Sequence, residues 1–512
     1  MLMLDPTDPL NLSISLGAAL LLYLLVRRAH SHPLPPSPRS YPLVGHIFSI
    51  PTSNEHLGFI ELGNQLKTNI LSFSFLGQTT IVLNSMEDVT NLLKNRSGIY
   101  SDRCYPPMVV DPSLMDCGKT IDALGYGDRW RKCRRLIHPW LTKKACRSFH
   151  NSQKQDARLL LQRLALFERT SSEIIYTEVF AALSGTLFQS IYGYRISGRD
   201  DHLLREGMQL IQNVCEASVP ANFLVNIFPA LCYVPSWFPG AGWKRVAREW
   251  KEQKNKLVQD CLNKTKQEMM SGSWEPSIIA SSLAEAKTLG LSTEEIDDYL
   301  SNIGITLYLA GTDTTTAAVI PVFFFAMIHF PEAQNRAQAE IDSLIGDSRL
   351  PEMEDIHQLP YTNCLIQEVL RWCPIAPLGV PHAVSEDDFY RGFLIPKGAI
   401  VIGNVWAMSR DKKIYENPEE FNPDRYLDPS VPPCPIFGFG RRECPGTHYA
   451  ESSLFIMIAS ILAAFNIKKP ANEDLAGTRP TGKMTVVFRL DEFGVIIEPR
   501  SVKHAQLVRT GA

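Results

Sequence analysis

The stretch Phe437–Gly446, Phe-Gly-Phe-Gly-Arg-Arg-Glu-Cys-Pro-Gly, constrains this chain more than any other. Beyond it, apolar side chains recur at three- and four-residue steps as far as Phe465, which predicts a helix directly after the stretch. Pro445 suits the first turn of such a helix, where a missing N–H costs nothing. Cys444 would then lie at the positive end of the helix dipole, where free N–H groups favour a thiolate. The stretch therefore predicts a cysteine that binds a metal.

The residues around Cys444 suit an iron carried in a flat macrocycle. Gly440 and Gly446 would let the backbone come close to a haem. Arg442 adds a cation that could pair with a propionate, and Phe437 would pack on the proximal side. A lone cysteine at a helix start is more often a buried structural residue. The whole pattern F-x-x-G-x-R-x-C-x-G, however, resembles the signature of the cytochrome P450 family, the haem-thiolate monooxygenases.

Composition narrows the class of protein. A chain of 512 residues with 45% hydrophobic content can bury one large core or two ordinary ones. The 51 basic and 54 acidic residues nearly cancel, and no long basic run is present, which argues against a nucleic-acid partner. The eleven cysteines are scattered, odd in number and free of C-x-x-C pairs, which favours a reducing compartment. We therefore expect the catalytic part to face the cytosol.

Residues 10–26 are the only candidate membrane segment in the sequence, a little shorter than the roughly 20 residues that a bilayer requires. Two arginines follow this run and two aspartates precede it, so the positive-inside rule places residues 1–9 in the lumen. We therefore interpret residues 10–28 as a transmembrane signal-anchor. A cleaved signal peptide is the alternative, and it is disfavoured because the basic pair follows the apolar run.

A proline-rich stretch, residues 29–46, comes next and is expected to be an extended, stiff hinge before a catalytic domain of residues 47–512. Residues 70–75 alternate in polarity, turn at 76–78 and resume at 79–83, which predicts a β-hairpin. Further strands are predicted between Val380 and Asn404, whereas most of the chain between these regions has helical patterns. The expected fold class is mainly α with a small β subdomain.

A long apolar helix is predicted from Ser292 to about His329, beginning with a capping box. Its middle holds Ala310-Gly311-Thr312-Asp313-Thr314-Thr315-Thr316, and glycine, an acid and four threonines are poor choices for a buried helix. A Ser/Thr-rich kink is the simplest explanation, but A-G-x-D-T-T resembles the oxygen-activation motif of the family. The resemblance implies a locally widened helix in which Ala310 and Gly311 leave room for dioxygen. It also implies that Asp313 and Thr314 supply protons.

Two further motifs match the family in position. Trp130 and Arg134 share a helix face, and this W-x-x-x-R pair resembles the helix that binds the haem propionates. Glu368 and Arg371 lie three residues apart on an apolar helix, where a buried ion pair would need further partners. Arg425 is the predicted third member, and the resemblance implies a structural ion network rather than a catalytic one.

These motifs occur in family order, so the resemblance covers essentially the whole chain. It implies one haem b between the Asp313 helix and the Cys444 helix, with Cys444 as axial iron ligand. It also implies electrons from NADPH through cytochrome P450 reductase, with cytochrome b5 as a second donor, and a single-pass location in endoplasmic reticulum membrane lipid. The sequence looks most like microsomal members from mushroom-forming fungi that act in secondary metabolism.

The expected substrate is a lipophilic small molecule, with a terpenoid favoured over a polyketide or an indole compound. Residues 375–378 and 486–488 are apolar and could line its pocket, although core packing explains them equally well. One alternative keeps the fold and changes the reaction to that of an isomerase, a dehydratase or a ring-forming oxidase. Another is a haem sensor or ligand-binding membrane protein without turnover.

Overall fold

The computed structural model describes residues 32–42, 44–198, 200–286, 288, 290–471, 480–484 and 487–511, without the side chains of 315–317. The expected luminal residues 1–9 and signal-anchor 10–28 lie outside the described residues, as does Val486 of the predicted pocket wall.

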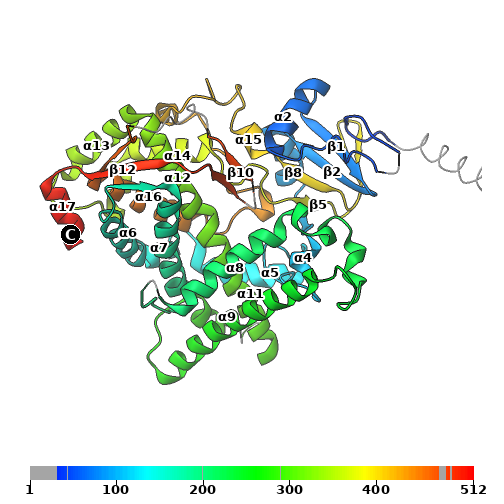
Figure 1. Ribbon diagram of the computed structural model, residues 1–512, viewed down its shortest axis with the longest axis horizontal. Helices are drawn as coiled ribbons and strands as arrows, with labels where there is room; N and C mark the ends of the chain where they lie inside the picture. Colours follow the sequence, from blue (N-terminus) through cyan, green and yellow to red (C-terminus); the bar gives the residue numbers. More distant parts are fainter. Residues whose placement is uncertain are drawn as a thin grey trace, which may run out of the picture.

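The described chain folds into a mainly helical body, with the hairpin of residues 70–83 at one end and the strand of residues 494–499 among the helices towards the other (Figure 1). This arrangement confirms the expected fold class. The longer helices are α2 (Glu55–Leu66), α5 (Asp128–Leu141), α6 (His150–Leu164), α7 (Ser172–Tyr192), α8 (His202–Ser218), α9 (Trp243–Ser271), α11 (Thr293–Gly311), α12 (Ala318–His329), α13 (Pro331–Ile345), α14 (Pro360–Trp372) and α16 (Thr447–Ala464). The shorter ones are α3 (Met86–Val89), α4 (Pro107–Val110), α10 (Ile278–Ala286), α15 (Val405–Met408) and α17 (Val502–Thr510).

The largest sheet has the strand order β1-β2-β8-β5-β3. The predicted hairpin forms its edge, because β1 (Ile70–Phe75) pairs antiparallel with β2 (Gln78–Leu83) through a turn at Leu76 and Gly77, both with positive φ. Its other strands are β3 (Asp102–Arg103), β5 (His382–Ala383) and β8 (Ile400–Gly403). Three smaller sheets pair β6 (Asp388–Tyr390) with β7 (Phe393–Ile395), β10 (Gly482–Met484) with β11 (Phe488–Leu490), and β12 (Gly494–Pro499) with both β4 (Arg169–Ser171) and β9 (Phe465–Lys468).

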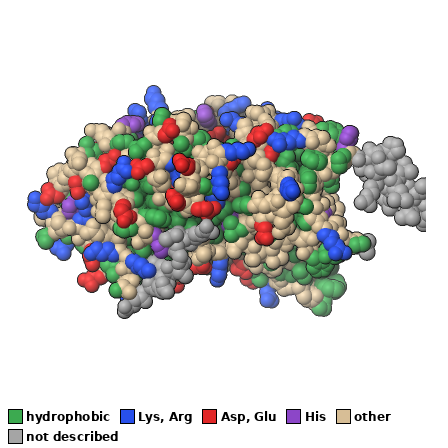
Figure 2. All heavy atoms as spheres, turned by 90° about the horizontal axis from the view of Figure 1, so that it is seen from above, with side chains coloured by type: hydrophobic (Ala, Val, Ile, Leu, Met, Phe, Trp, Pro, Cys, Tyr) green, Lys and Arg blue, Asp and Glu red, His purple; other side chains and the backbone are tan. Residues whose placement is uncertain are grey.

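Three helical stretches among the described residues are long and apolar enough to cross a membrane: Ser172–Tyr192, Thr293–His329 and Thr447–Ala464. Most of each stretch is buried inside the protein, where it forms the central core. A helix that is covered on all sides is apolar all round, whether protein or lipid covers it. By length and composition, residues 10–26 are not the only candidate span, so that expectation is wrong. The surface in Figure 2, by contrast, carries interspersed acidic and basic side chains.

The long helix predicted from Ser292 is widened in its middle, as expected. Its capping box is present at Ser292 and Glu295, and α11 passes into a π-helical segment, η7 (Thr312–Ala317), before α12 continues to His329. The Thr312 hydroxyl donates to the Tyr308 carbonyl at 2.7 Å, a bond that competes with the regular helical ladder. The polar run thus changes the local helix type rather than ending the helix.

The described part of the proline-rich hinge lies on the folded body. The main-chain oxygens of Pro35 and Pro36 accept hydrogen bonds from the hydroxyl and amide of Ser72 in β1, at 2.5 and 2.9 Å. Leu394 in β7 donates its amide to the Pro33 oxygen at 2.9 Å. Residues 33–36 are therefore docked to two strands and do not form a free spacer.

Candidate haem site

Cys444 lies in the loop that leads directly into α16. Its amide donates to the Phe437 carbonyl at 2.8 Å, which brings the two ends of the motif together. The helix α16 begins at Thr447 with Gly446 as its N-cap, so Pro445 precedes the helix. The prediction that Pro445 lies in the first turn is therefore wrong. The Thr447 hydroxyl donates to the Cys444 carbonyl at 2.9 Å and holds the loop against the helix start.

The Cys444 side chain has an exposed surface although protein atoms crowd its sulfur on other sides. This crowding raises the pKa of the thiol above its ordinary value, while the Gly446 amide and the Arg134 cation oppose the rise. The sequence predicted that free N–H groups at the helix start would favour the thiolate that ligates iron, and the iron-bound thiolate stays a prediction. For the thiol, burial is the larger influence because it penalises the charged form.

The two glycines of the loop have different surroundings. Gly440 has φ +57, and a Cβ there would overlap the Leu93 carbonyl of η1 (Thr90–Asn95). Its missing side chain therefore lets the loop approach η1, whereas the sequence predicted an approach to a macrocycle. Gly446 lies beside the sulfur, since an added Cβ would lie 3.7 Å from the Cys444 Sγ atom.

Arg442 is buried and ties the loop to a distant segment. Its guanidinium donates to the carbonyls of Ser101 at 2.7 Å, Ile121 at 3.2 Å and Leu124 at 2.5 Å. Burial, and then the neighbouring Arg103 cation, lower the pKa of Arg442 to about 10. All three of its nitrogens bind main-chain oxygens, and the pairing with a propionate that the sequence suggested stays a prediction.

Helix α5 brings the W-x-x-x-R pair to the same loop. Arg134 donates to the Glu443 carbonyl at 3.3 Å, and its guanidinium lies 5.5 Å from the ring centre of Trp130. Arg442 covers the same indole ring at 4.8 Å. Burial lowers the pKa of Arg134, although the nearby Cys444 opposes this. Two cations and a buried indole therefore surround the approach to Cys444.

The widened helix lies next to the helix that follows the Cys444 loop. Helix α16 packs against η7, and α5 packs against both α11 and α16. Ala310 is exposed and Thr314 is half-buried, although most of this long helix is buried. Gly311 has a packing role, because an added Cβ would lie 2.9 Å from the side chain of Leu187 in α7. The exposed surface at Ala310 and Thr314 is thus available to a cofactor or a substrate.

Asp313 is buried, and its carboxylate is held by three other elements. Its Oδ1 atom accepts hydrogen bonds from the Tyr176 hydroxyl of α7 and from Arg489 of β11, the latter at 3.0 Å. Its Oδ2 atom lies 3.7 Å from the Cys215 thiol of α8. Sequence reasoning missed these partners. Tyr176 and Arg489 lie 137 and 176 residues from Asp313 along the chain, and no local pattern marks them.

The predicted ion network is assembled on α14. Glu368 and Arg371 are fully buried and form two hydrogen bonds of 2.7 Å. Arg425 donates its Nε atom to both Glu368 oxygens at 3.1 and 3.0 Å. Arg371 also donates to the carbonyls of Ser409 and Pro418, each at 2.8 Å. The network therefore ties α14 to the segment that leads to the Cys444 loop.

The donor set of the site is one thiol. Among the residues that the structure describes, no group of three or more His, Cys, Asp or Glu side chains could hold a metal ion. A bare ion would need several such ligands, whereas haem iron receives four nitrogens from its own macrocycle and needs one axial ligand from the protein. A single cysteine on a loop, beside Gly446 and two arginines, fits haem.

Comparison with known proteins agrees with this geometry. The model of the cytochrome P450 family matches residues 35–487. The chain belongs to the cytochrome P450 family. It is 35% identical over 503 residues to cytochrome P450 monooxygenase COX2 of Coprinopsis cinerea, covering 96% of this chain and 94% of the relative. It is 36% identical over 482 residues to tryptamine 4-monooxygenase of Psilocybe cyanescens, covering 91% and 93%. The protein is thus a P450 monooxygenase, an oxidoreductase of a family that uses haem b and whose standard electron source is NADPH through a reductase.

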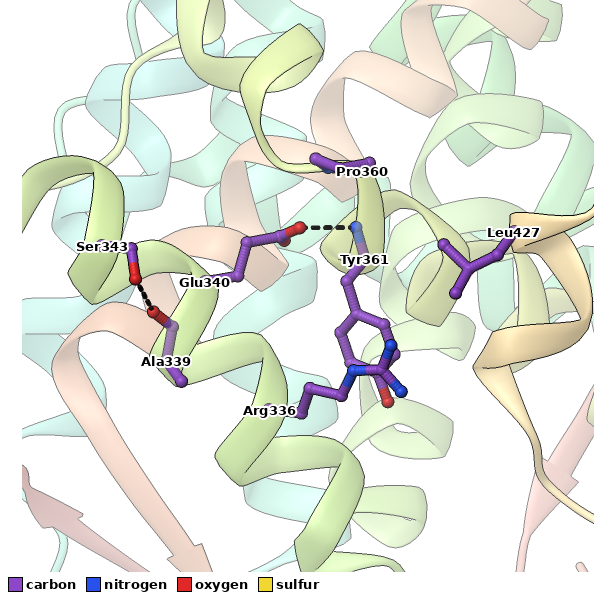
Figure 3. Close-up of a pocket in the computed structure, with 7 residues that line it drawn as sticks. All are labelled: Arg336, Ala339, Glu340, Ser343, Pro360, Tyr361 and Leu427. Atoms are coloured by element: carbon purple, nitrogen blue, oxygen red, sulfur yellow. Dashed lines mark hydrogen bonds between the residues drawn. The ribbon is translucent and has the colours of Figure 1, made fainter.

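A hollow of about 430 Å³ between α13 and α14 shares no residue with the P450 haem site (Figure 3). Glu340 accepts from the amides of Tyr361 at 2.7 Å and Thr362 at 2.8 Å, and so caps α14. Arg336 lies 4.2 Å from the ring centre of Tyr361. The polar side chains of this hollow are therefore engaged in structural contacts. Its lining residues are Arg336, Ala339, Glu340, Ser343, Pro360, Tyr361 and Leu427.

Proposed function

We propose that this P450 inserts oxygen from O2 into a lipophilic small molecule of fungal secondary metabolism. The observation that carries the proposal is that α16, the helix directly after the Cys444 loop, packs against the widened segment η7, and that Ala310, just before this segment, is exposed. Cys444 would hold the iron, and Trp130 with Arg134 would hold the propionates. The bound haem supplies the oxidation chemistry, and the protein supplies position and electrostatics.

The protein's own residues account for the proton supply. The Thr314 hydroxyl donates to the Ala310 carbonyl, on the widened turn, and lies at a half-buried surface. Its neighbour Asp313 is buried and accepts hydrogen bonds from Tyr176 of α7 and Cys215 of α8. We assign Thr314 the delivery of a proton at its hydroxyl oxygen and Asp313 the replenishment of that proton.

We infer the substrate class from the apolar segments that are expected to line the pocket. Phe488 donates its amide to the Ile375 carbonyl at 2.7 Å, so two of the predicted wall segments meet. A terpenoid is the favoured class, and an indole amine is the second, because one relative is named as a tryptamine monooxygenase. A panel of both classes, screened by substrate-induced shifts of the haem spectrum, separates them.

We also propose that residues 10–28 anchor the protein in the endoplasmic reticulum membrane, with the domain of residues 47–512 in the cytosol. The segment between α8 and α9 exposes Tyr233, Trp237 and Phe238, with relative exposures of 90%, 79% and 51%. Exposed aromatic side chains suit a membrane interface. Alkaline extraction of microsomes, with and without residues 1–28, tests the anchor.

The deciding experiment uses the full chain in microsomes with a fungal reductase, NADPH and isotopically labelled dioxygen. We expect the label in the product and a carbon-monoxide difference band that Cys444→Ala abolishes. Cys104→Ala removes another exposed cysteine and should leave the band intact. A product without label would instead indicate an isomerase or dehydratase. A stable haem protein that consumes NADPH only at background with every substrate would indicate a sensor.

A further inference from the structure

The partners of Asp313 form a compact cluster that the A-G-x-D-T-T motif does not contain. The Nη2 atom of Arg489 donates both to Asp313 Oδ1 at 3.0 Å and to the Tyr176 hydroxyl oxygen at 2.8 Å. The Tyr176 hydroxyl in turn donates to the same Oδ1 atom. The guanidinium also lies 4.5 Å from the ring centre of Tyr176. Carboxylate, phenol and guanidinium therefore contact one another in a closed triangle.

The burial of this cluster changes the pKa of the groups that surround Asp313. The Asp313 side chain is 5% exposed, and Arg489, 38% exposed, is its ion-pair partner. Burial alone would lower the pKa of Arg489, but Asp313 and Tyr176 outweigh it, so the pKa is raised. Burial and then Asp313 raise the pKa of Cys215 to about 12, and the same causes raise that of Tyr176. Phenol and thiol thus stay protonated at neutral pH and donate to the two oxygens of the carboxylate.

The cluster also sets where the acid points. Ala310 and Thr314 lie at the open surface of the widened helix, whereas Asp313 is 4% exposed. Both carboxylate oxygens meet groups from α7, α8 and β11, none of which belongs to the motif. The orientation of the carboxylate therefore depends on residues far away in the sequence.

We propose that Tyr176 and Arg489 are positioning residues that hold the Asp313 carboxyl group in the orientation from which it passes protons taken from solvent water to the Thr314 hydroxyl. The inference rests on the proposed function, because it concerns the proton supply of the same reaction. Removal of the cation leaves the buried carboxylate without its ion-pair partner, so the contact that fixes its orientation from β11 is lost. Removal of the phenol takes away one of the two hydrogen bonds to the Oδ1 atom and loosens the same orientation.

The test compares Arg489→Met and Tyr176→Phe with Arg489→Lys, which keeps the charge, and with Arg336→Met, a matched control at an ion pair that is exposed on both sides. The readout is product formed per NADPH consumed, together with its pH profile. We expect about a tenfold loss for Arg489→Met, less than the roughly 10²–10⁴-fold that a positioned acid or base contributes, because the acid itself remains. We expect a smaller loss for Tyr176→Phe and partial recovery in Arg489→Lys. Substrate-induced spectral shifts should stay unchanged.

A second readout does not depend on turnover. Infrared difference spectra identify the Asp313 carboxyl band as the one that Asp313→Asn removes, and this band should be shifted in Arg489→Met and unchanged in Arg336→Met. If wild-type enzyme couples NADPH to product and both variants behave like Arg336→Met, the inference is overturned while the proposed function stands. An Asp313 band that is the same in wild-type protein and in folded Arg489→Met also overturns it. Wild-type protein without labelled product would refute the proposed function instead.

Discussion

Glu368→Gln tests whether the buried ion network stabilises the fold around the Cys444 loop. Glu368 has no exposed surface and accepts hydrogen bonds from Arg371, from Arg425 and from the Asn422 amide at 2.8 Å. Glutamine keeps the shape but removes the negative charge, so Arg371, which is also fully buried, loses its charge partner. Breaking a buried ion pair by removing one partner typically costs 3–5 kcal/mol.

The structure places the expected loss near the lower end of that range. Arg371 keeps three carbonyl acceptors, at Ser409, Pro418 and Glu420, which partly solvate the remaining cation. We therefore expect the free energy of unfolding to fall by about 3 kcal/mol, measured as a shift of the urea midpoint in the detergent-solubilised chain.

The control is Glu498→Gln, whose partner Lys468 lies 2.6 Å away on the surface. Both of these side chains are about half exposed, and such pairs contribute roughly 0–1 kcal/mol. Haem retention, followed by the carbon-monoxide band during the same titration, should fall earlier in Glu368→Gln than in the control. Equal midpoints for the two variants would refute the view that this network is a major source of stability.

Three further predictions follow from single contacts. Gly440→Ala should destabilise the loop by about 1–3 kcal/mol, because the residue has positive φ and faces a carbonyl, whereas Gly446→Ala should cost less in the same urea titration. Burial, and then Arg410 and Arg103 respectively, lower the pKa of His56 to about 4 and of His382 to about 3. The folded state then binds fewer protons than the unfolded state below pH 6.5, so the free energy of unfolding has its full value above that pH. It should fall by about 2 kcal/mol per histidine between pH 6.5 and 5, and His382→Asn should flatten the measured pH dependence. Thr314→Ala should leave haem spectra unchanged but lower product per NADPH, and unchanged coupling would contradict its role.

Features with a local cause could be predicted from the sequence. The hairpin at residues 70–83 and the capping box at Ser292 need only neighbouring residues, and the structure contains both. The widened helix followed from a run of residues that are poor helix formers in a buried position. The spacing of Glu368 and Arg371 placed them on one face because a helix repeats every 3.6 residues.

Features that depend on distant residues could not be predicted in this way. The carbonyls that bind Arg442 lie more than 300 residues before it, and the contact of Gly440 with η1 also joins remote segments. A helix start beside Cys444 is visible in the sequence, but the burial of the sulfur, which raises the pKa of the thiol, is not.

The sequence by itself therefore determined the order of the motifs, the elements that carry them and the single thiol available to haem iron. Tertiary structure alone decided which partners those residues meet, and the Asp313 carboxylate is the clearest case. Its neighbours Tyr176, Cys215 and Arg489 come from α7, α8 and β11. The physical reason is range: helix and turn preferences act within a few residues, whereas burial and ion pairing depend on whatever the fold brings within a few ångströms.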